Sequence, residues 1–369
     1  MPDSPTITGV SPHTVRLPRT ALRDMLRLQH TLERLARLPG YRHLLHDQLP
    51  ETARFNPGTA SVLMGYDFHL TNDGPRLIEV NTNAGGGLFA LHAALGTEPD
   101  LPFRLEQRLC AMFADALPTN NNGTRPLPQR LVILDDKPQE QFLYPEMQAF
   151  SRLFASWGID ANIVEPQQLE ASAAGVFLDG KPVDLIYNRH CDFYLETDPL
   201  AGVRAAWLAG TVSLSPHPTA YGLLADKRRL CLFSDPDQLT AAGLDAAGIA
   251  LLQRLVPESR LLADFDREAL WKERKKWVFK PATSHASRGV LVGAKATRGR
   301  FTELDPQTTI VQRYVPPSLS AAGEDTPMKT DLRLFSWAGH ALGLGARLYH
   351  GQVTNLRTEG GGFARIRLA

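Results

Sequence analysis

The chain has 369 residues, of which 43% are hydrophobic and 21% are charged, with a formal net charge of +1 at pH 7. This length predicts two or three domains with a sizeable core, and the balanced charge argues against a general nucleic-acid or membrane-surface binder. Cys110, Cys191 and Cys231 are far apart and form no C-x-x-C, so neither a disulfide framework nor a zinc site is indicated. Because the sequence has no apolar run of about 18 residues and no basic-then-apolar leader, we expect a cytoplasmic protein without membrane contact.

The first part of the chain predicts an amphipathic helix after an irregular lead-in. Prolines are frequent in residues 1–19, whereas apolar residues recur at helical spacing from 20 to 45, with an interruption near Pro39. His43 and His46 lie one helical turn apart, but no third ligand is close in the sequence. A polar helix face is therefore a better interpretation of this pair than a metal site.

The stretch from Asp67 to Asn81 predicts a β-hairpin, because apolar residues alternate on both arms and Asn-Asp-Gly at 72–74 supplies the turn. Glu79 and Asn81 are two residues apart, so a strand places both side chains on one face, and Asp67 on the other arm can approach them. Two carboxylates and an amide oxygen suit Mg²⁺ held against nucleotide phosphates, and a solvated hairpin edge is the alternative. Three glycines at 85–87 precede expected helices over 88–95 and 102–117.

A linker-like segment at 118–126 separates this part from a region in which strands and helices alternate. Buried strands are expected at 131–134, 161–164 and 183–187, with a helix between the first two, which predicts a small parallel α/β sheet. The last strand leads into Asn188 and Arg189, at the sheet edge where ligands usually bind. We therefore expect residues 128–222 to help form an acceptor pocket with Asn188, Arg189 and Asp192, in which Arg189 could bind a carboxylate.

The next region contains two lysines in patterns that suit phosphate binding. A helix is expected over 220–233 and carries Lys227, and a strand over 277–281 has Lys280 at its exit. The small-residue loop after Lys280 is followed by a second strand over 290–293. A strand, a loop and a strand can fold over a polyphosphate through backbone N–H groups, although the chain has no Walker A motif. Another strand, over 309–315, stops at two prolines.

The C-terminal region predicts a second hairpin, with strands over 331–337 and up to 349. Alternation leaves Asp331 and Arg333 on one strand face, and Arg347 on the return strand can meet them. Asn355 and Arg357 follow, shortly before three glycines at 360–362.

Together these motifs resemble the ATP-grasp superfamily, with one change of order. In D-alanine–D-alanine ligase and bacterial glutathione synthetase a hairpin like Asp67–Asn81 closes the chain, whereas here it stands near the front. Eukaryotic glutathione synthetase and the glutathionylspermidine synthases are similar to the present arrangement. The resemblance covers roughly residues 20–90 and 130–365. It implies an α/β (α+β) protein: a circularly permuted ATP-grasp fold with a Rossmann-like domain ahead of the ATP-grasp part.

The same resemblance implies four units. Residues 1–127 would form a helical segment with the metal-binding hairpin, and 128–222 would form the Rossmann-like domain. Residues 223–311 would form the lid, and 312–369 the central sheet, which packs with 60–95.

The resemblance also assigns roles to individual residues. The implied metal ligands are Asp67, Glu79 and Asn81. The implied nucleotide contacts are Lys227, Lys280, the lid-loop residues Ser287, Arg288 and Gly289, the adenine-hinge residues Gln312, Tyr314 and Val315, and Asp331. His285 could also contact phosphate, and Glu324 or Asp325 could bind the ribose. Gln312 stands where an acidic residue often precedes the hinge. The implied catalytic residues are Arg347, Arg333, Asn355 and Arg357.

The implied activity is an ATP-dependent ligase that uses Mg²⁺ or Mn²⁺ and joins a small carboxylate to an amine through an acyl phosphate. Amino-acid or peptide-like substrates are expected, and the sequence does not identify the acid or the amine. Two alternatives stay open: a kinase that phosphorylates a small-molecule hydroxyl, and a non-catalytic nucleotide-binding protein. No nucleic-acid partner is expected, and a homodimer is allowed.

Overall fold

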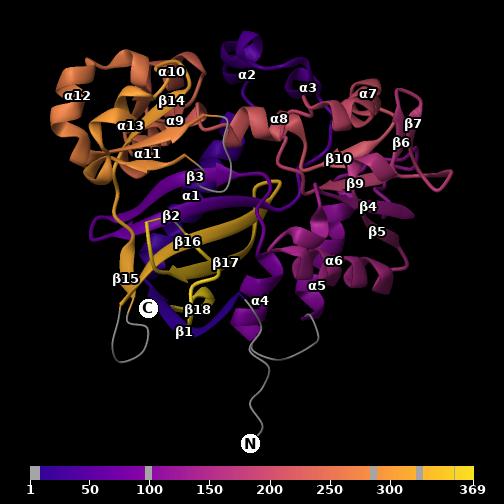
Figure 1. Ribbon diagram of the computed structural model, residues 1–369. Helices are drawn as coiled ribbons and strands as arrows, with labels where there is room; N and C mark the ends of the chain where they lie inside the picture. Colours follow the sequence, from indigo (N-terminus) through magenta and orange to yellow (C-terminus); the bar gives the residue numbers. More distant parts are fainter. Residues whose placement is uncertain (1–8, 96–101, 283–288, 321–326, 353) are drawn as a thin grey trace, which may run out of the picture.

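The computed structural model describes residues 9–95, 102–282, 289–320, 327–352 and 354–369. A central seven-stranded sheet lies between a parallel α/β unit and a smaller antiparallel sheet with its own helices (Figure 1). A three-stranded sheet extends from the α/β unit and consists of β6 (Glu170–Ser172), β7 (Gly175–Leu178) and β8 (Lys181–Pro182). Among the described residues, no helix combines the length and the apolar character needed to cross a membrane.

The central sheet contains both predicted hairpins, in the order β1-β18-β17-β16-β2-β3, with β15 paired to β16. Its strands are β1 (Val10–Leu17), β2 (Met64–Thr71), β3 (Gly74–Asn81), β15 (Ser318–Ser320), β16 (Met328–Trp337), β17 (His340–Tyr349) and β18 (Gly362–Leu368). Asp67 on β2 lies opposite Glu79 on β3 and opposite Arg333 on β16. Asp331 on β16 lies opposite Arg347 on β17. The pairing of β2 with β16 therefore joins the two hairpins at their charged residues.

One face of the central sheet is covered by helices, and α1 (Arg19–Leu35) is the longest of them. Its apolar stripe, from Met25 to Leu35, is fully buried and packs in one cluster with Tyr66, Phe68 and Leu77 of the hairpin. The shorter helices α2 (Pro39–Leu45), α3 (Glu51–Arg54) and α11 (Ala246–Leu255) join the same layer. Asp67 lies on the opposite face, where a helix packs against β1, β17 and β18 and the rest of the face can form a site.

The expected irregular lead-in is wrong over residues 10–17, because these residues form β1, which pairs in parallel with β18. Pro12 suggested a loop, but β1 is an edge strand, and a proline without an N–H is tolerated at a sheet edge. Neither β1 nor β18 was predicted.

The α/β unit has the predicted parallel sheet, in the order β10-β9-β4-β5. Its strands are β4 (Arg130–Leu134), β5 (Asp160–Val164), β9 (Leu185–Asn188) and β10 (Ser213–Ser215). An aromatic cluster of Phe113, Phe150, Phe154 and Tyr187 binds α5 (Phe103–Ala114) and α6 (Tyr144–Ser156) to one face. Trp207 of α7 (Ala201–Ala209) is buried on the other. The helix α4 (Gly87–Leu95) packs between this unit and the central sheet.

The lid sheet is antiparallel, in the order β11-β14-β12-β13. Its strands are β11 (Ser259–Leu261), β12 (Trp277–Pro281), β13 (Leu291–Val292) and β14 (Thr309–Arg313), and its helices include α9 (Arg229–Phe233), α10 (Pro236–Ala241), α12 (Arg267–Glu273) and α13 (Arg298–Thr302). Gln312 belongs to this sheet, because β14 continues to Arg313. The resemblance placed the end of the lid at 311 and so assigned Gln312 to the central sheet.

The helix expected over 220–233 is interrupted. The chain forms α8 (Pro218–Ala220), one π-helical turn (Tyr221–Ala225) and then α9, so Lys227 lies in a turn. Asp226 causes the break: its backbone is extended, its carboxylate accepts the N–H of Arg228 at 3.0 Å, and it accepts the hydroxyl of Tyr194 at 2.7 Å. Aspartate competes with helix hydrogen bonds in this way because its side chain is short and polar.

Candidate active site

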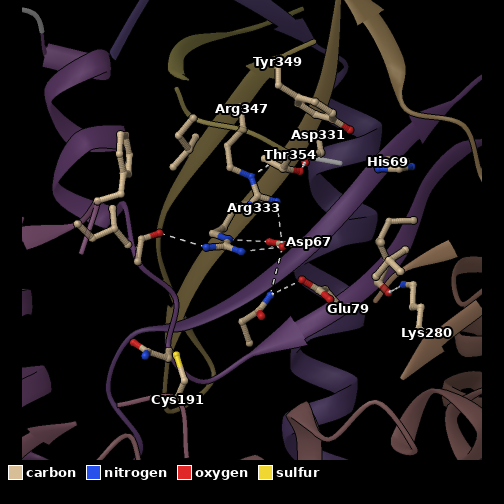
Figure 2. A pocket seen from close by; sticks show the side chains of 18 of the residues that line it. Asp67, His69, Glu79, Cys191, Lys280, Asp331, Arg333, Arg347, Tyr349 and Thr354 are labelled. Carbon is tan, nitrogen blue, oxygen red and sulfur yellow. Dashed lines mark hydrogen bonds and ion pairs between the residues drawn. The ribbon is translucent and has the colours of Figure 1, made fainter. Parts of the chain in front are cut away.

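A cavity of about 420 Å³ lies where the central sheet, the lid sheet and the α/β unit meet (Figure 2). Most of the predicted site residues line it, namely Asp67, Glu79, Asn81, Lys280, Gln312, Tyr314, Val315, Asp331, Arg333 and Arg347. The lid sheet contributes one face, because the side chains of Val278, Lys280 and Gln312 point to the same side of it. Residues from distant parts of the sequence therefore share one space.

Four buried side chains form a charged network at the centre of the cavity. Arg333 binds Asp67 with two hydrogen bonds, from Nε at 2.6 Å and from Nη2 at 2.7 Å. Arg347 bridges the two acids, donating to Asp67 at 2.9 Å and to Asp331 at 2.5 Å. All four residues are less than a tenth exposed, so their interactions are weakly screened by water. The two cations and two anions compensate each other and fix both guanidinium groups in place.

Asp67, which the resemblance assigned to the metal, is paired with both arginines. Burial acts to raise its pKa, but Arg333 and Arg347 outweigh burial and hold the pKa of Asp67 well below its usual range. Its two oxygens accept hydrogen bonds from both arginines and from Asn81 Nδ2. This arrangement argues against Asp67 as a direct metal ligand and favours it as the anchor of the two arginines. Among the described residues, no three His, Cys, Asp or Glu side chains are grouped to hold a metal ion.

Glu79 and Asn81 remain as a pair that fits Mg²⁺. The amide nitrogen of Asn81 donates to Asp67 at 3.1 Å and to Glu79 at 3.2 Å, which turns Asn81 Oδ1 away from both carboxylates. One carboxylate and one amide oxygen suit Mg²⁺, because this ion keeps much of its coordination shell as water and substrate phosphate.

Lys280 reaches the hairpin from the lid. Its Nζ donates to the backbone carbonyl of Ile78, next to Glu79, at 2.9 Å, and the residue is only 5% exposed. Burial lowers the pKa of Lys280 to about 8; Glu79 acts in the opposite direction and Lys227 lowers the pKa further. Lys227 is therefore close enough to Lys280 to influence it, although it does not line the cavity. A buried lysine beside Glu79 gives this end of the cavity a positive group that can bind an anion.

The other end of the cavity belongs to the α/β unit and contains Arg189 and Asp135, which follow β9 and β4. Both are buried, and burial raises the pKa of Asp135 to about 6 while Arg189 acts to lower it. Gly85 packs closely beside them: a Cβ there would lie 2.6 Å from Arg189 Nη2 and 2.2 Å from Leu143 Cδ1, so a larger residue would displace both side chains. Asp135 was missed from the sequence, although it follows a buried strand just as Arg189 does.

The glycine-rich loop before α4 is held by Glu146, which was also missed. Its two carboxylate oxygens accept the N–H groups of Gly86 at 2.8 Å and Leu88 at 2.9 Å. A carboxylate at a helix N-terminus satisfies donors that the helix itself leaves unpaired. Two further residues, His69 and Thr354, line the cavity without a sequence signal. The ring of His69 lies 2.7 Å from the carbonyl of Val315, and the hydroxyl of Thr354 donates to the carboxylate of Asp331 at 2.5 Å.

Several predicted residues are not brought to the cavity wall. Asn355 accepts the backbone N–H of Arg357 at 3.0 Å within a turn, and the Arg357 guanidinium lies 5.4 Å from the centre of the Phe142 ring. Thr354 and Leu356 line the cavity instead. Asp192 accepts the N–H of Thr197 at 2.7 Å, and Asn188 accepts that of His190 at 3.1 Å.

The lid loop is described only in part. Gly289 has a φ of +74°, and a Cβ there would lie 2.8 Å from Pro281 Cγ, so glycine is needed at this turn. His285, Ser287 and Arg288, and likewise Glu324 and Asp325, lie outside the described residues.

Asp67→Asn should destabilise the protein by about 3–5 kcal/mol at pH 7, because it leaves two buried arginines with too little negative charge. Because the pKa of Asp67 is lower in the folded protein than in the unfolded chain, ionised Asp67 stabilises the fold at every pH above the ordinary aspartate pKa. This stabilisation is lost as pH falls from that value through the pKa of Asp67 in the folded protein. Urea unfolding of both proteins at pH 7 and below pH 4 measures this difference. Asp24→Asn, which breaks an exposed pair with Arg254, is the control and should cost no more than about 1 kcal/mol. Equal losses in the two variants would contradict the buried network.

No protein-family model matches the chain, and no curated protein matches it in sequence. Its fold is similar to that of a glutathione synthetase-like effector (GSS30) from Globodera pallida in apo form, with a TM-score of 0.61 and 11% identity over 98% of this chain and 90% of that one. It is also similar to a protein named as a gamma-glutamylcysteine synthetase from Methylobacillus flagellatus KT, with a TM-score of 0.51 and 13% identity over 95% and 87% of the two chains.

The ATP-grasp ligase PsnB, solved with a minimal precursor, Mg and ADP, matches 64% of this chain at a TM-score of only 0.32, well below those of the other two structures. At such identities the two better matches show a shared fold and leave activity open. The rotated order of the motifs also stays a prediction. The chain therefore has an ATP-grasp-like α/β fold, which it shares along nearly its whole length with the glutathione synthetase-like effector.

Proposed function

We propose that this protein is an ATP- and Mg²⁺-dependent ligase that joins a carboxylate to an amine through an acyl phosphate. The observation that carries this proposal is one cavity in which Lys280 of the lid lies beside Glu79 and Asn81, with Arg333 and Arg347 next to them. Phosphoryl transfer requires mainly positioning and charge neutralisation, and these groups supply both. The shared fold supports the proposal, since both similar structures carry the name of a synthetase.

Each group would have a defined task at the phosphate end. Lys280, with Lys227 close by, would neutralise the α- and β-phosphates of ATP. The end of β14, with Gln312, would bind the adenine base. Glu79 and Asn81 would hold Mg²⁺, which would supply positive charge to neutralise the nucleotide phosphates. Arg347 binds its two acids through Nε and Nη2, so its Nη1 edge is available to the transferring phosphoryl group.

The proposed reaction accounts for the buried acids, because they hold the two arginines in position before the substrate binds. A guanidinium that is already fixed loses little freedom when the phosphoryl group arrives, so its stabilisation favours the transition state. Asp67 fixes Arg333 and Arg347, and Asp331 fixes Arg347 from the other side. Asp331, which the resemblance assigned to the nucleotide, would act here as a positioning residue. Asn355 and Arg357 lie in the turn next to this network, and we propose that they support Thr354 and Leu356 at the wall.

The acceptor end would select the substrates. Arg189 would bind a substrate carboxylate, and the acid to be activated would lie between Arg189 and the arginines of the central sheet. An amine would then attack the acyl phosphate, forming a C–N bond and releasing phosphate. Amino acids and short peptides carry both groups, which makes them the first substrates to test.

A product assay tests the proposal directly. The protein is incubated with ATP, Mg²⁺ and a panel of amino acids and short peptides, and ADP, free phosphate and the mass of new products are measured. A ligase yields ADP, phosphate and amide in equal amounts, and hydroxylamine in place of the amine traps the acyl phosphate as a hydroxamate. A stable phosphorylated product without free phosphate would instead indicate a kinase. Nucleotide binding without ADP formation on any substrate would indicate a non-catalytic binder.

Arg189→Gln should raise the KM for the carboxylate substrate about 100-fold and leave the KM for ATP within about twofold, because a buried charged contact is lost at one end of the cavity only. Steady-state kinetics with the acid found in the panel measures both values. Arg152→Gln, an exposed arginine on α6 of the same unit, is the matched control. An unchanged KM for the acid would remove Arg189 from the acceptor site.

A further inference from the structure

The acceptor end of the candidate active-site cavity carries two charges of opposite sign that lie side by side. Leu134 at the end of β4 lies opposite Asn188 at the end of β9, and the backbone N–H of Arg189 donates to the carbonyl of Leu134 at 2.8 Å. Asp135 and Arg189 are the next residues of the two strands, and both line the cavity. The parallel pairing therefore brings a carboxylate and a guanidinium to one edge of the sheet.

Asp135 keeps one oxygen without a partner although the residue is only 6% exposed. Its Oδ1 accepts the backbone N–H of Asp136 at 2.8 Å, and no other hydrogen bond or ion pair of the described residues involves this carboxylate. Oδ2 is therefore unpaired, and it is not one of the unpaired polar atoms that are sealed from solvent. Burial raises the pKa of Asp135 to about 6, because its surroundings compensate the anion only in part. A cation that entered the cavity would relieve this cost.

Arg189 is buried to a similar degree, at 5% exposed, and it likewise forms no ion pair with any described residue. Its guanidinium lies over the ring of Tyr187, 5.7 Å from the ring centre. Glu146 acts on it electrostatically, but both oxygens of Glu146 accept backbone N–H groups of the glycine-rich loop. Burying a charge costs free energy unless an opposite charge compensates it. Arg189 and Asp135 are thus each available to a ligand group of opposite charge.

A zwitterion matches this pair better than a simple ion does. A plain carboxylate would pair with Arg189 but would place a second negative charge close to Asp135, and a phosphate group would do so more strongly. A divalent cation would pair with Asp135 but would be repelled by Arg189. The head of an amino acid carries a carboxylate and an ammonium group on one carbon, so it can compensate both buried charges at once.

We propose that the acceptor end binds the head of an amino acid, with its carboxylate on Arg189 and its ammonium group on Asp135. This inference rests on the proposed function, because it takes this end of the cavity as the substrate site. Asp135 is the only acidic residue among the described residues of the α/β unit that line the cavity. It would therefore set specificity: a substrate without a free amino group leaves the carboxylate unpaired and binds more weakly.

The test is calorimetric titration of the full chain with the common amino acids. For each one that binds, its N-acetyl derivative and the corresponding acid without the amino group are titrated as well. The free amino acid should bind about 30-fold more tightly than either, since both analogues leave Asp135 unpaired. Asp135→Asn should weaken binding of the amino acid about 30-fold and should not weaken binding of the acid without the amino group.

Asp135→Asn keeps the shape of the side chain and the acceptor for the N–H of Asp136, so it should melt no lower than the wild type. Asp136→Asn, the same change at the exposed neighbour, is the control and should bind amino acids normally. Amino-acid binding without ADP formation in the product assay would contradict the proposed function and leave this inference intact. Absence of amino-acid binding, equal affinity for the N-acetyl derivatives, or binding unchanged in Asp135→Asn would overturn the inference even in an active ligase.

Discussion

Lys280→Met should lower kcat for ATP-dependent product formation about 1,000-fold, because it removes the buried positive charge beside the triphosphate. Its effect on folding should be small. The charged lysine is only 5% exposed, and burying an ammonium costs stability at neutral pH, so an apolar side chain of similar length is tolerated. Steady-state kinetics and thermal melting of the two proteins measure these effects. Lys276→Met, an exposed lysine just before β12 that pairs with Glu273, is the matched control.

The same lysine should impose a pH dependence on nucleotide binding. Burial lowers the pKa of Lys280 to about 8, and the ammonium form is the one that binds phosphate. Affinity for ATP should therefore fall as pH rises through about 8 in the wild type and stay flat over this range in Lys280→Met. The free energy of unfolding should change in the opposite direction. It should rise between pH 8 and the ordinary pKa of lysine, because the folded protein loses the buried charge before the unfolded chain does. A flat wild-type profile would place Lys280 away from the phosphates.

Glu79→Gln should lower kcat about 1,000-fold and raise the Mg²⁺ concentration needed for half-maximal rate, because an amide binds Mg²⁺ far more weakly than a carboxylate. The amide oxygen can still accept the hydrogen bond from Asn81, so folding should be unaffected. Rates measured over a range of Mg²⁺ and Mn²⁺ concentrations give both quantities. The control is Asp73→Asn, the same change of chemistry at the exposed turn of the same hairpin. If Glu79→Gln kept full ATP consumption and the same metal dependence, the metal assignment would be wrong.

The hairpin at Asp67–Asn81 could be predicted from the sequence because its information is local. Alternation and the Asn-Asp-Gly turn define the strands, and the spacing of Glu79 and Asn81 puts both on one face. The pairing of β2 with β16 is not local, since Asp67 and Arg333 are 266 residues apart. Sequence spacing predicts the face on which Asp67 lies, but it cannot predict the pairing with Arg333, because the two strands are far apart in the chain.

The errors in secondary structure have similar causes. Pro12 argues for a loop by local rules, and only its position at the edge of the central sheet makes a strand acceptable. Apolar spacing over 220–233 argues for one helix, but Asp226 binds Tyr194, 32 residues away, and Arg228, which stops the helix before Lys227. In each case a tertiary contact or sheet position overrides a local pattern.

A crystal structure with Mg²⁺ and a non-hydrolysable ATP analogue would test most directly whether the lid and the hairpin act on one triphosphate. The account predicts phosphate oxygens against Lys280 Nζ and a metal ion bound by Glu79 and Asn81, with Asp67 still paired to Arg333 and Arg347. A nucleotide bound outside this cavity, or one that touches Lys280 while Glu79 faces only solvent, would contradict it.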